Sequence, residues 1–338
     1  MRMKKFLRRA RVPVLCVLLA AVVLLCAVAA YPALCGRETA ENASYSGILR
    51  VWQIDSFEGG TGSRAAFLTA CARSFESENQ GVKLLVTYHT AESAANAAAG
   101  GEYPDILSFG TGTDFAADAA LPQAWEKFAA VLLGGEACAV PWCRGQYFLF
   151  TVEGDFSDVS GGNTVISQGK GANPAAAAYA EGLTGEYTVL DSLAAYTAFL
   201  RGEYVYMLGS QRDVYRFAAR DVAVRAQPMT GFCDLWQYAA VCTREEDRAD
   251  AALGFVRYLL SEEVQSSLWR IGMLPVSGSA YEQGSESMCA AQQETPQKTV
   301  SAFLTSQTVE LLRESAASAL NGDESGAKNL EKYLLEAL

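Results

Sequence analysis

Short apolar strands alternate with amphipathic helices near the start of the chain, and this alternation limits the possible folds more than any other feature. Leu49–Asp55 and Val82–Thr90 have the composition of strands, and Gly101–Gly110 supplies a third. Between the first two strands, apolar residues recur with the spacing of one helix face. The order strand, helix, strand, helix, strand predicts an α/β sheet with right-handed crossovers. Such sheets bind ligands at the carboxyl ends of their strands, so the loops Ser56–Ser63 and Ser108–Asp114 are the first places to look for a site.

The N-terminus differs sharply from the rest of the chain. Six basic residues lie within residues 2–11, and residues 12–35 contain no charged side chain. A helix of that length spans a bilayer, and its basic flank faces the cytoplasm. We expect residues 1–36 to be a signal peptide or membrane anchor. The length of the apolar run favours an uncleaved anchor, and cleavage after the small residues 27–29 is the alternative. The rest of the chain is then extracellular, anchored at the membrane or secreted.

Composition excludes several classes of function. Half of the 338 residues are apolar, which suits two lobes, and the net charge of −11 gives no reason to expect a nucleic-acid partner. His89 is the only histidine and no CxxC motif occurs, so we expect no Cys/His metal site and no cofactor. A catalytic triad would have to use His89, which has no nucleophile signature nearby, and we expect no enzyme activity. Most of the cysteines after residue 36 are expected to be free, buried thiols.

Five segments resemble, in order, the extracellular solute-binding proteins of ABC importers, the large family that includes maltose-binding protein. The segments are LRVWQIDSFEGG (49–60), GEYPDILSFG (101–110), VPWCRGQYFLF (140–150), FLRGEYVYMLGS (199–210) and RADAALGFVRYLLSEEVQSSLWRIGMLPVS (248–277). The resemblance covers about residues 47–338. It implies a two-lobed, periplasmic-binding-protein-like (Venus flytrap) α/β fold, whose crossing hinge strands let the lobes close on a ligand.

The resemblance also implies how the chain divides. The expected parts are a tether at 37–46, a first lobe at 47–140 and 235–280, and a second lobe at 141–234 and 281–338. The hinge crossings are expected near Val140–Gly145 and Gln227–Trp236. Glu153–Asn173 is short and polar and lacks the Pro-Thr-Trp helix start of the family, so we expect a trimmed second lobe.

Aromatic and acidic residues beside the inferred cleft suggest the ligand. Aromatic faces stack on sugar rings and carboxylates bind hydroxyl groups, so a carbohydrate is the first expectation. The glycine-rich start of a helix at residues 59–63 and the guanidinium of Arg212 favour instead a carboxylate or phosphate. For Trp236, packing in the core is as good an interpretation as contact with the ligand. The expected ligand-binding residues are Asp55, Phe57, Glu58, Trp142, Tyr147, Ser210, Arg212, Asp234 and Trp236.

Together these features predict a solute-binding protein. We expect the chain to bind a small solute, sugar first and anionic solute second, and to deliver it unchanged to the permease subunits of an ABC transporter. The alternative is a membrane-tethered sensor or interaction module with the same fold. A hydrolase is the third class, although no particular pair of carboxylates is marked for it.

Overall fold

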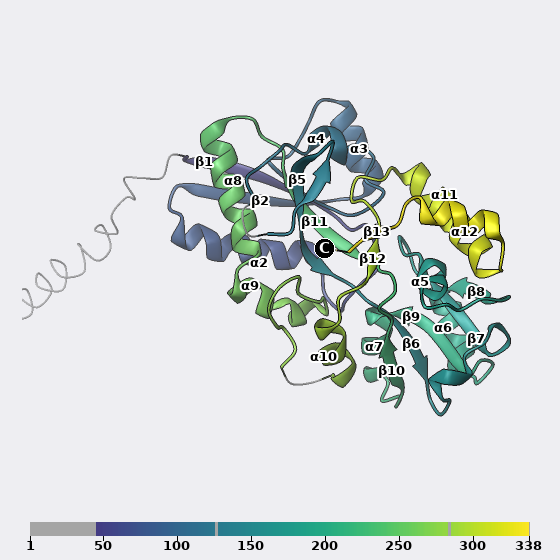
Figure 1. Cartoon of the computed structure of the whole chain (residues 1–338). Coiled ribbons are helices and arrows are strands. Elements are labelled where there is room, and N and C mark those ends of the chain that lie inside the picture. Colours follow the sequence, from purple (N-terminus) through teal and green to yellow (C-terminus); the bar gives the residue numbers. More distant parts are fainter. Residues whose placement is uncertain (1–44, 126–127, 283–284, 338) are drawn as a thin grey trace, which may run out of the picture.

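The computed structural model describes residues 45–125, 128–282 and 285–337 (Figure 1). The predicted membrane segment, residues 1–36, lies outside the described residues. Within the described ranges, no helix is both long enough and apolar enough to cross a bilayer.

A six-stranded sheet forms the centre of what we call the first lobe, in the order β2-β1-β3-β11-β5-β4. As the sequence predicts, β1 is parallel to both β2 and β3. β11 runs antiparallel to β3 and β5, and it completes the middle of the sheet. The strands are β1 (Gly47–Ile54), β2 (Val82–His89), β3 (Ile106–Phe109), β4 (Val131–Leu133), β5 (Glu136–Arg144) and β11 (Trp236–Val241).

A five-stranded sheet forms the centre of the second lobe, in the order β10-β6-β9-β7-β8. Its strands β7, β8 and β9 are parallel, and β6 pairs antiparallel with β9 and β10. The strands are β6 (Tyr147–Thr151), β7 (Thr164–Gln168), β8 (Thr188–Asp191), β9 (Tyr206–Ser210) and β10 (Arg225–Pro228). β7 lies in a segment whose many turn residues hid it from sequence analysis.

Helices cover both sheets and begin at capping residues. Ser63 caps α2 by accepting the Ala66 amide N–H, and Gly81 follows the helix with a positive φ of 98° that glycine favours. The helices are α2 (Arg64–Glu78), α3 (Ala91–Ala99), α4 (Ala116–Ala119), α5 (Pro174–Ala180), α6 (Ser192–Leu200), α7 (Gln211–Ala218), α8 (Glu246–Leu259), α9 (Glu262–Ser266), α10 (Glu286–Gln293), α11 (Ser306–Leu320) and α12 (Glu324–Glu331).

The C-terminal region departs from the sequence prediction in two places. The polar composition of residues 278–298 predicts a loop, but α10 forms there, and Ser285 caps its first turn. The sequence also predicts a last helix over Lys328–Leu338, and this prediction is wrong in its extent. α12 ends at Glu331, and β13 (Leu335–Glu336) then pairs with β12 (Lys298–Thr299).

The chain crosses between the two sheets at several adjacent points. It leaves the first sheet through Gly145 and Gln146, between β5 and β6, and returns through residues 229–235, between β10 and β11. Leu274 pairs with Arg144 and adds a further connection beside them. Figure 1 shows the two sheets lying apart, with these segments between them.

Helix α11 forms a bridge over the two lobes. At its start, the Ser306 amide N–H and hydroxyl donate to the Asp114 carboxylate of the first lobe, at 2.6 and 2.8 Å. At its end, the Leu320 carbonyl accepts the Gly185 amide N–H of the second lobe, at 2.8 Å. The same helix packs against α5, beside which it lies in Figure 1. α11 therefore contacts both walls of the space between the lobes.

Candidate ligand-binding cleft

The carboxyl ends of parallel strands from the two lobes meet in a closed cleft. Gly171, just after β7, lies so close to the first lobe that a Cβ atom there would be 1.7 Å from the Ser56 carbonyl oxygen. Nearby, the Glu58 amide N–H donates to the Lys170 carbonyl at 3.2 Å. The lobes are therefore in direct backbone contact where β1 and β7 end.

Five polar residues lie at strand and helix ends on the two sides of this contact, and we call them the polar ring: Ser56, Thr111, Tyr147, Asn173 and Asp234. The Tyr147 hydroxyl donates to Asp234 Oδ1 at 2.6 Å and accepts the Asn173 amide N–H at 2.7 Å. These contacts join the start of β6, the start of α5 and the chain entering β11. Two of the sequence-predicted site residues, Tyr147 and Asp234, are thus brought together.

The first lobe completes the polar ring through Gly110. A Cβ atom at Gly110 would lie 1.8 Å from Ser56 Oγ and 3.0 Å from the Trp236 carbonyl oxygen, so the end of β3 packs against both neighbouring strands. Thr111 follows directly. Both Ser56 and Thr111 fall in loops that the sequence marks as first candidates.

Three side-chain atoms of the polar ring are buried without a hydrogen-bond partner among the described residues. They are Ser56 Oγ, Thr111 Oγ1 and Asn173 Nδ2. A buried polar group without a hydrogen-bond partner lowers the free energy of unfolding by about 1–3 kcal/mol, so such groups are rare in folded proteins. Each of these two hydroxyls and this amide N–H can make a further hydrogen bond to a polar ligand or to water.

Burial and neighbouring groups set the charge of the polar ring. Burial raises the pKa of Asp234 to about 6, against the hydrogen bond from Tyr147 and the nearby positive charge of Arg313 on α11, which lower it. Burial also raises the pKa of Tyr147 well above its usual value, and the Asp234 carboxylate adds to the rise. At neutral pH the ring therefore holds one carboxylate, and Tyr147 remains a hydroxyl donor.

A second group of residues lines an open cavity of about 340 Å³ at the outer end of the cleft, which we call the charged pocket. Arg64 Nε pairs with Asp55 at 2.7 Å, and Arg212 of the second lobe pairs with Glu58 of the first. Lys170 and the backbone of residues 59–62 complete the wall. The predicted residues Asp55, Phe57, Glu58 and Arg212 all line this pocket.

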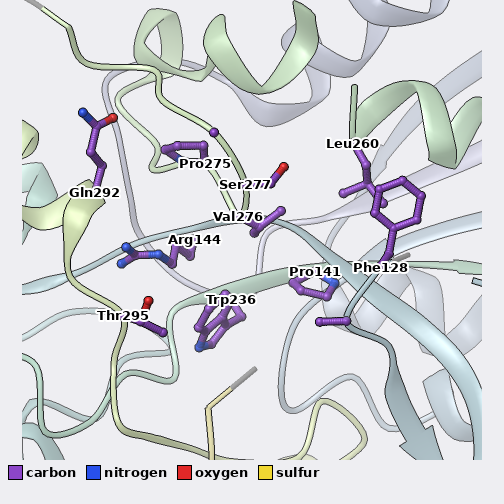
Figure 2. A pocket seen from close by; sticks show the side chains of 12 residues that line it. Phe128, Pro141, Arg144, Trp236, Leu260, Pro275, Val276, Ser277, Gln292 and Thr295 are labelled. Carbon is purple, nitrogen blue, oxygen red and sulfur yellow. The ribbon is translucent and has the colours of Figure 1, made fainter. Parts of the chain in front are cut away.

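Trp236 lies apart from both groups, in a cavity of about 370 Å³ beside the crossing strands (Figure 2). Its indole is only 4% exposed and donates through Nε1 to the Cys233 carbonyl at 3.0 Å. Figure 2 shows Arg144 lining the same cavity, and its guanidinium lies 5.9 Å from the ring. Arg144 also donates to the Ala291 and Glu294 carbonyls at the end of α10. The Trp236 indole is therefore packed beside the segment 229–235 that links the two sheets.

Three other expected site residues are held by contacts within the protein. Trp142 is fully buried, stacks on Phe67 at 6.1 Å and donates through Nε1 to Ser108 Oγ at 2.9 Å, so its ring belongs to the core. Phe57 is buried under the Arg64 guanidinium, which lies 4.3 Å from its ring. Ser210 caps α7, with its amide N–H bonded to Asp213.

Sequence analysis did not single out Thr111, Asn173 and Lys170 as site residues, nor Ser56 individually. The sequence does contain a signal for a helix start at Asn173, because this residue precedes Pro174 and is the N-cap of α5. Its position in the cleft, however, depends on the pairing of β7 with β9, which no local pattern predicts.

His89, the cysteines and the possible metal-binding groups can be placed within the described ranges. The ring of His89 packs on Trp52, with centroids 4.4 Å apart, and burial lowers its pKa. Its Nδ1 lies 3.4 Å from Ser93 Oγ. Among the described residues no group of His, Cys, Asp and Glu has the geometry to hold a metal ion. The six described cysteines are free, and four of them are buried.

Comparison with known proteins supports the fold. No family model matches the sequence, and no curated protein matches it. The GacH receptor of Streptomyces glaucescens, solved unliganded and with acarbose, is 19% identical, with a TM-score of 0.54 over 85% of this chain and 97% of that chain. The cyclic α-maltosyl-1,6-maltose binding protein of Arthrobacter globiformis is 13% identical, with a TM-score of 0.59 over 85% and 97%.

A third structure points the same way. The sugar-binding protein MalE of Xanthomonas citri is 14% identical, with a TM-score of 0.58 over 85% of this chain and 95% of that chain. All three likenesses extend over nearly the whole length of the known proteins, so they concern both lobes and not a shared sheet alone. The chain therefore has the two-lobed α/β fold of the maltose-binding type of solute-binding protein.

Proposed function

We propose that this chain is an extracellular solute-binding protein that binds a carbohydrate between its lobes and delivers it to the permease of an ABC transporter. The polar ring is the observation that carries the proposal. It supplies unpartnered buried donors and acceptors from both lobes, beside the backbone contact of Gly171 with Ser56, and this supports a polar ligand. The printed descriptions of the structurally similar proteins, which name acarbose and maltose-type sugars, support the same ligand class.

The chemistry of the polar ring suits sugar hydroxyls. Each sugar hydroxyl is both a donor and an acceptor, and the ring offers both kinds of partner. The Asp234 carboxylate accepts, Asn173 Nδ2 donates, and the hydroxyls of Ser56 and Thr111 do either. Because these groups are buried, each one left unpaired by a wrong ligand weakens binding, which gives the site its specificity.

We further propose that the solute leaves unchanged. Most glycoside hydrolases use two carboxylates that flank the scissile bond. Here the Asp234 carboxylate accepts from Tyr147, and Asp55 and Glu58 of the charged pocket are each paired with an arginine. The phenol of Tyr147 stays protonated at neutral pH and bonded to Asp234, so it is a poor nucleophile or base.

The apolar run at residues 12–35 supports a position at the extracellular face of the membrane, tethered by that segment. Intact-mass analysis of the protein from cells tests the tether, since a mature N-terminus at Ala30 or Tyr31 would contradict it. A tethered sensor with the same fold remains the second candidate, favoured by the same apolar segment.

A thermal-shift screen of the detergent-solubilised full chain against sugars, amino acids and peptides tests the proposed function. A sugar at about 100 times its dissociation constant adds about 2.7 kcal/mol to the free energy of unfolding and raises the melting temperature. Asn173→Ala should weaken that binding about tenfold, while the matched change Asn329→Ala on the exposed face of α12 leaves it unchanged. If no sugar shifts the melting temperature, the sensor or interaction module is the better account. Products in the same incubations would indicate a hydrolase.

A further inference from the structure

We propose that the saccharide bound by this chain is acidic, and that the charged pocket holds its anionic group while the polar ring holds its hydroxyls. This inference rests on the proposed function, because the anionic group belongs to the same ligand. The shared chemistry is a carboxylate, as in a uronic acid, or a phosphate ester on the sugar.

The first support is the balance of charge in the pocket. Arg64, Lys170 and Arg212 line it, together with two carboxylates, Asp55 and Glu58. Each arginine is paired with one of those carboxylates. Lys170 is exposed, and its ammonium has no hydrogen bond or ion pair to any residue of the described ranges. The pocket therefore has an excess of one positive charge in a protein whose net charge is −11.

The second support is Arg64, which is only 4% exposed. Its Nε donates to Asp55 and its Nη2 donates to the Phe57 carbonyl. Its Nη1 is buried without a partner among the described residues. Arg64 is one of the residues that line the pocket, and its guanidinium keeps one N–H without an acceptor. An anionic oxygen makes the strongest bond to such a group.

The third support is the start of α2, a helix of 15 residues that opens at this pocket. The positive end of the helix dipole and the amide N–H groups of its first turn favour an anion there. Two contacts with Ile271 fix the loop that precedes this helix. Gly60 packs against the Ile271 carbonyl, and the Thr61 amide N–H donates to that carbonyl at 2.9 Å. The loop thus presents its glycine backbone to the pocket.

Consecutive residues in both lobes connect the polar ring with the charged pocket. Ser56 of the ring and Phe57 of the pocket are consecutive, and Gly171, which packs on Ser56, follows Lys170. The Glu58 carboxylate is paired with the Arg212 guanidinium. An incoming anion would displace Glu58 from Arg212, or it would bind next to this ion pair, beside Lys170. The cavity volume of about 340 Å³ is within the range of small-molecule sites.

Isothermal titration of the full chain with two matched sets of sugars tests this inference. One set is glucose, glucuronate and glucose 6-phosphate, and the other is galactose, galacturonate and galactose 6-phosphate. We expect an acidic member to bind at least about tenfold more tightly than its neutral parent, since charge-assisted hydrogen bonds are about twice as strong as neutral ones. The relative affinities of uronate and phosphate distinguish the two anionic groups.

Three variants assign the preference to the pocket. Lys170→Gln and Arg212→Gln should each lower the ratio of acidic to neutral affinity several-fold. Arg220→Gln removes an equal charge just after α7, away from the pocket, and should leave the ratio unchanged. The neutral sugar reports any general change in lobe closure. Neutral sugars bound as well as acidic ones, or a preference that survives in the Lys170→Gln/Arg212→Gln double variant, would overturn the inference and leave the proposed function standing. Failure of every sugar to bind would overturn both.

Discussion

The polar ring and the charged pocket line the same cleft, but they are built in opposite ways. The ring lies on strand ends and the crossing segments, where Tyr147 and Asp234 are buried and hydrogen-bonded. The pocket lies on loops and helix starts, where the ion pair of Glu58 with Arg212 is partly open to water. Buried hydrogen bonds keep most of their strength, whereas exposed ion pairs contribute about 0–1 kcal/mol. On the proposed function, the ring would supply most of the binding energy and the pocket would supply selectivity for charge.

The largest expected effect comes from the core behind the polar ring. Trp142→Ala should lower the free energy of unfolding by about 3–5 kcal/mol, because it empties a fully buried site and leaves Ser108 without its indole donor. Trp269→Ala is the matched control, since that indole is 54% exposed and should cost little. Chemical denaturation measures both. If Trp142→Ala kept its stability but lost sugar binding, Trp142 would belong to the site and not to its wall.

The next effect is a dependence on pH at the polar ring. The pKa of Asp234 is raised from 3.8 to about 6, so between these values the folded chain holds a proton that the unfolded chain has released. The free energy of unfolding should therefore fall as pH rises through this window, by about 3 kcal/mol at most. Asp234→Asn should remove that part of the slope, as followed by denaturation from pH 4 to 8.

An exposed residue provides the control for this pH dependence. Asp250→Asn on α8 introduces the same amide at a solvent-exposed position and should leave the slope unchanged. A slope that survives in Asp234→Asn would mean that another group titrates in this window and that burial does not raise the pKa of Asp234.

The smallest effect is expected at the charged pocket. Glu58→Gln removes an ion pair whose side chains are both about one-third exposed, so the free energy of unfolding should change by about 0–1 kcal/mol. The same variant frees Arg212 and should tighten the binding of an acidic sugar. Denaturation and titration measure the two results separately. A loss of stability as large as that of Trp142→Ala would show that the pocket is as tightly built as the ring.

The sequence predicted the first lobe better than the second lobe or the site, for physical reasons. β1, α2 and β2 follow from local spacing and from caps such as Ser63, which act within a few residues. The polar ring instead joins positions 56, 111, 147, 173 and 234, which only the pairing of crossing strands brings together.

The sequence also did not show in which direction the aromatic side chains of the strands point. β5 is buried almost throughout, so its sequence lacks the alternation that would show which way Trp142 points. Lys170 and Asn173 lie after β7, a strand that the surrounding turn residues concealed. Tyr147 and Asp234 were predicted as separate candidates, and their hydrogen bond required the fold.

Closure of the lobes on the ligand is the central claim, and Gly171→Ala tests it most directly. The added Cβ atom would lie 1.7 Å from the Ser56 carbonyl, which prevents the closed contact, and residue 171 has a φ of 68°. Gly182→Ala is the matched control, since its φ is 78° and its Cβ atom would meet nothing within 4 Å. We expect titration to show sugar binding weakened at least about tenfold in Gly171→Ala relative to Gly182→Ala. Equal affinity of the two variants would contradict the account, because the ligand would then bind without the closed cleft.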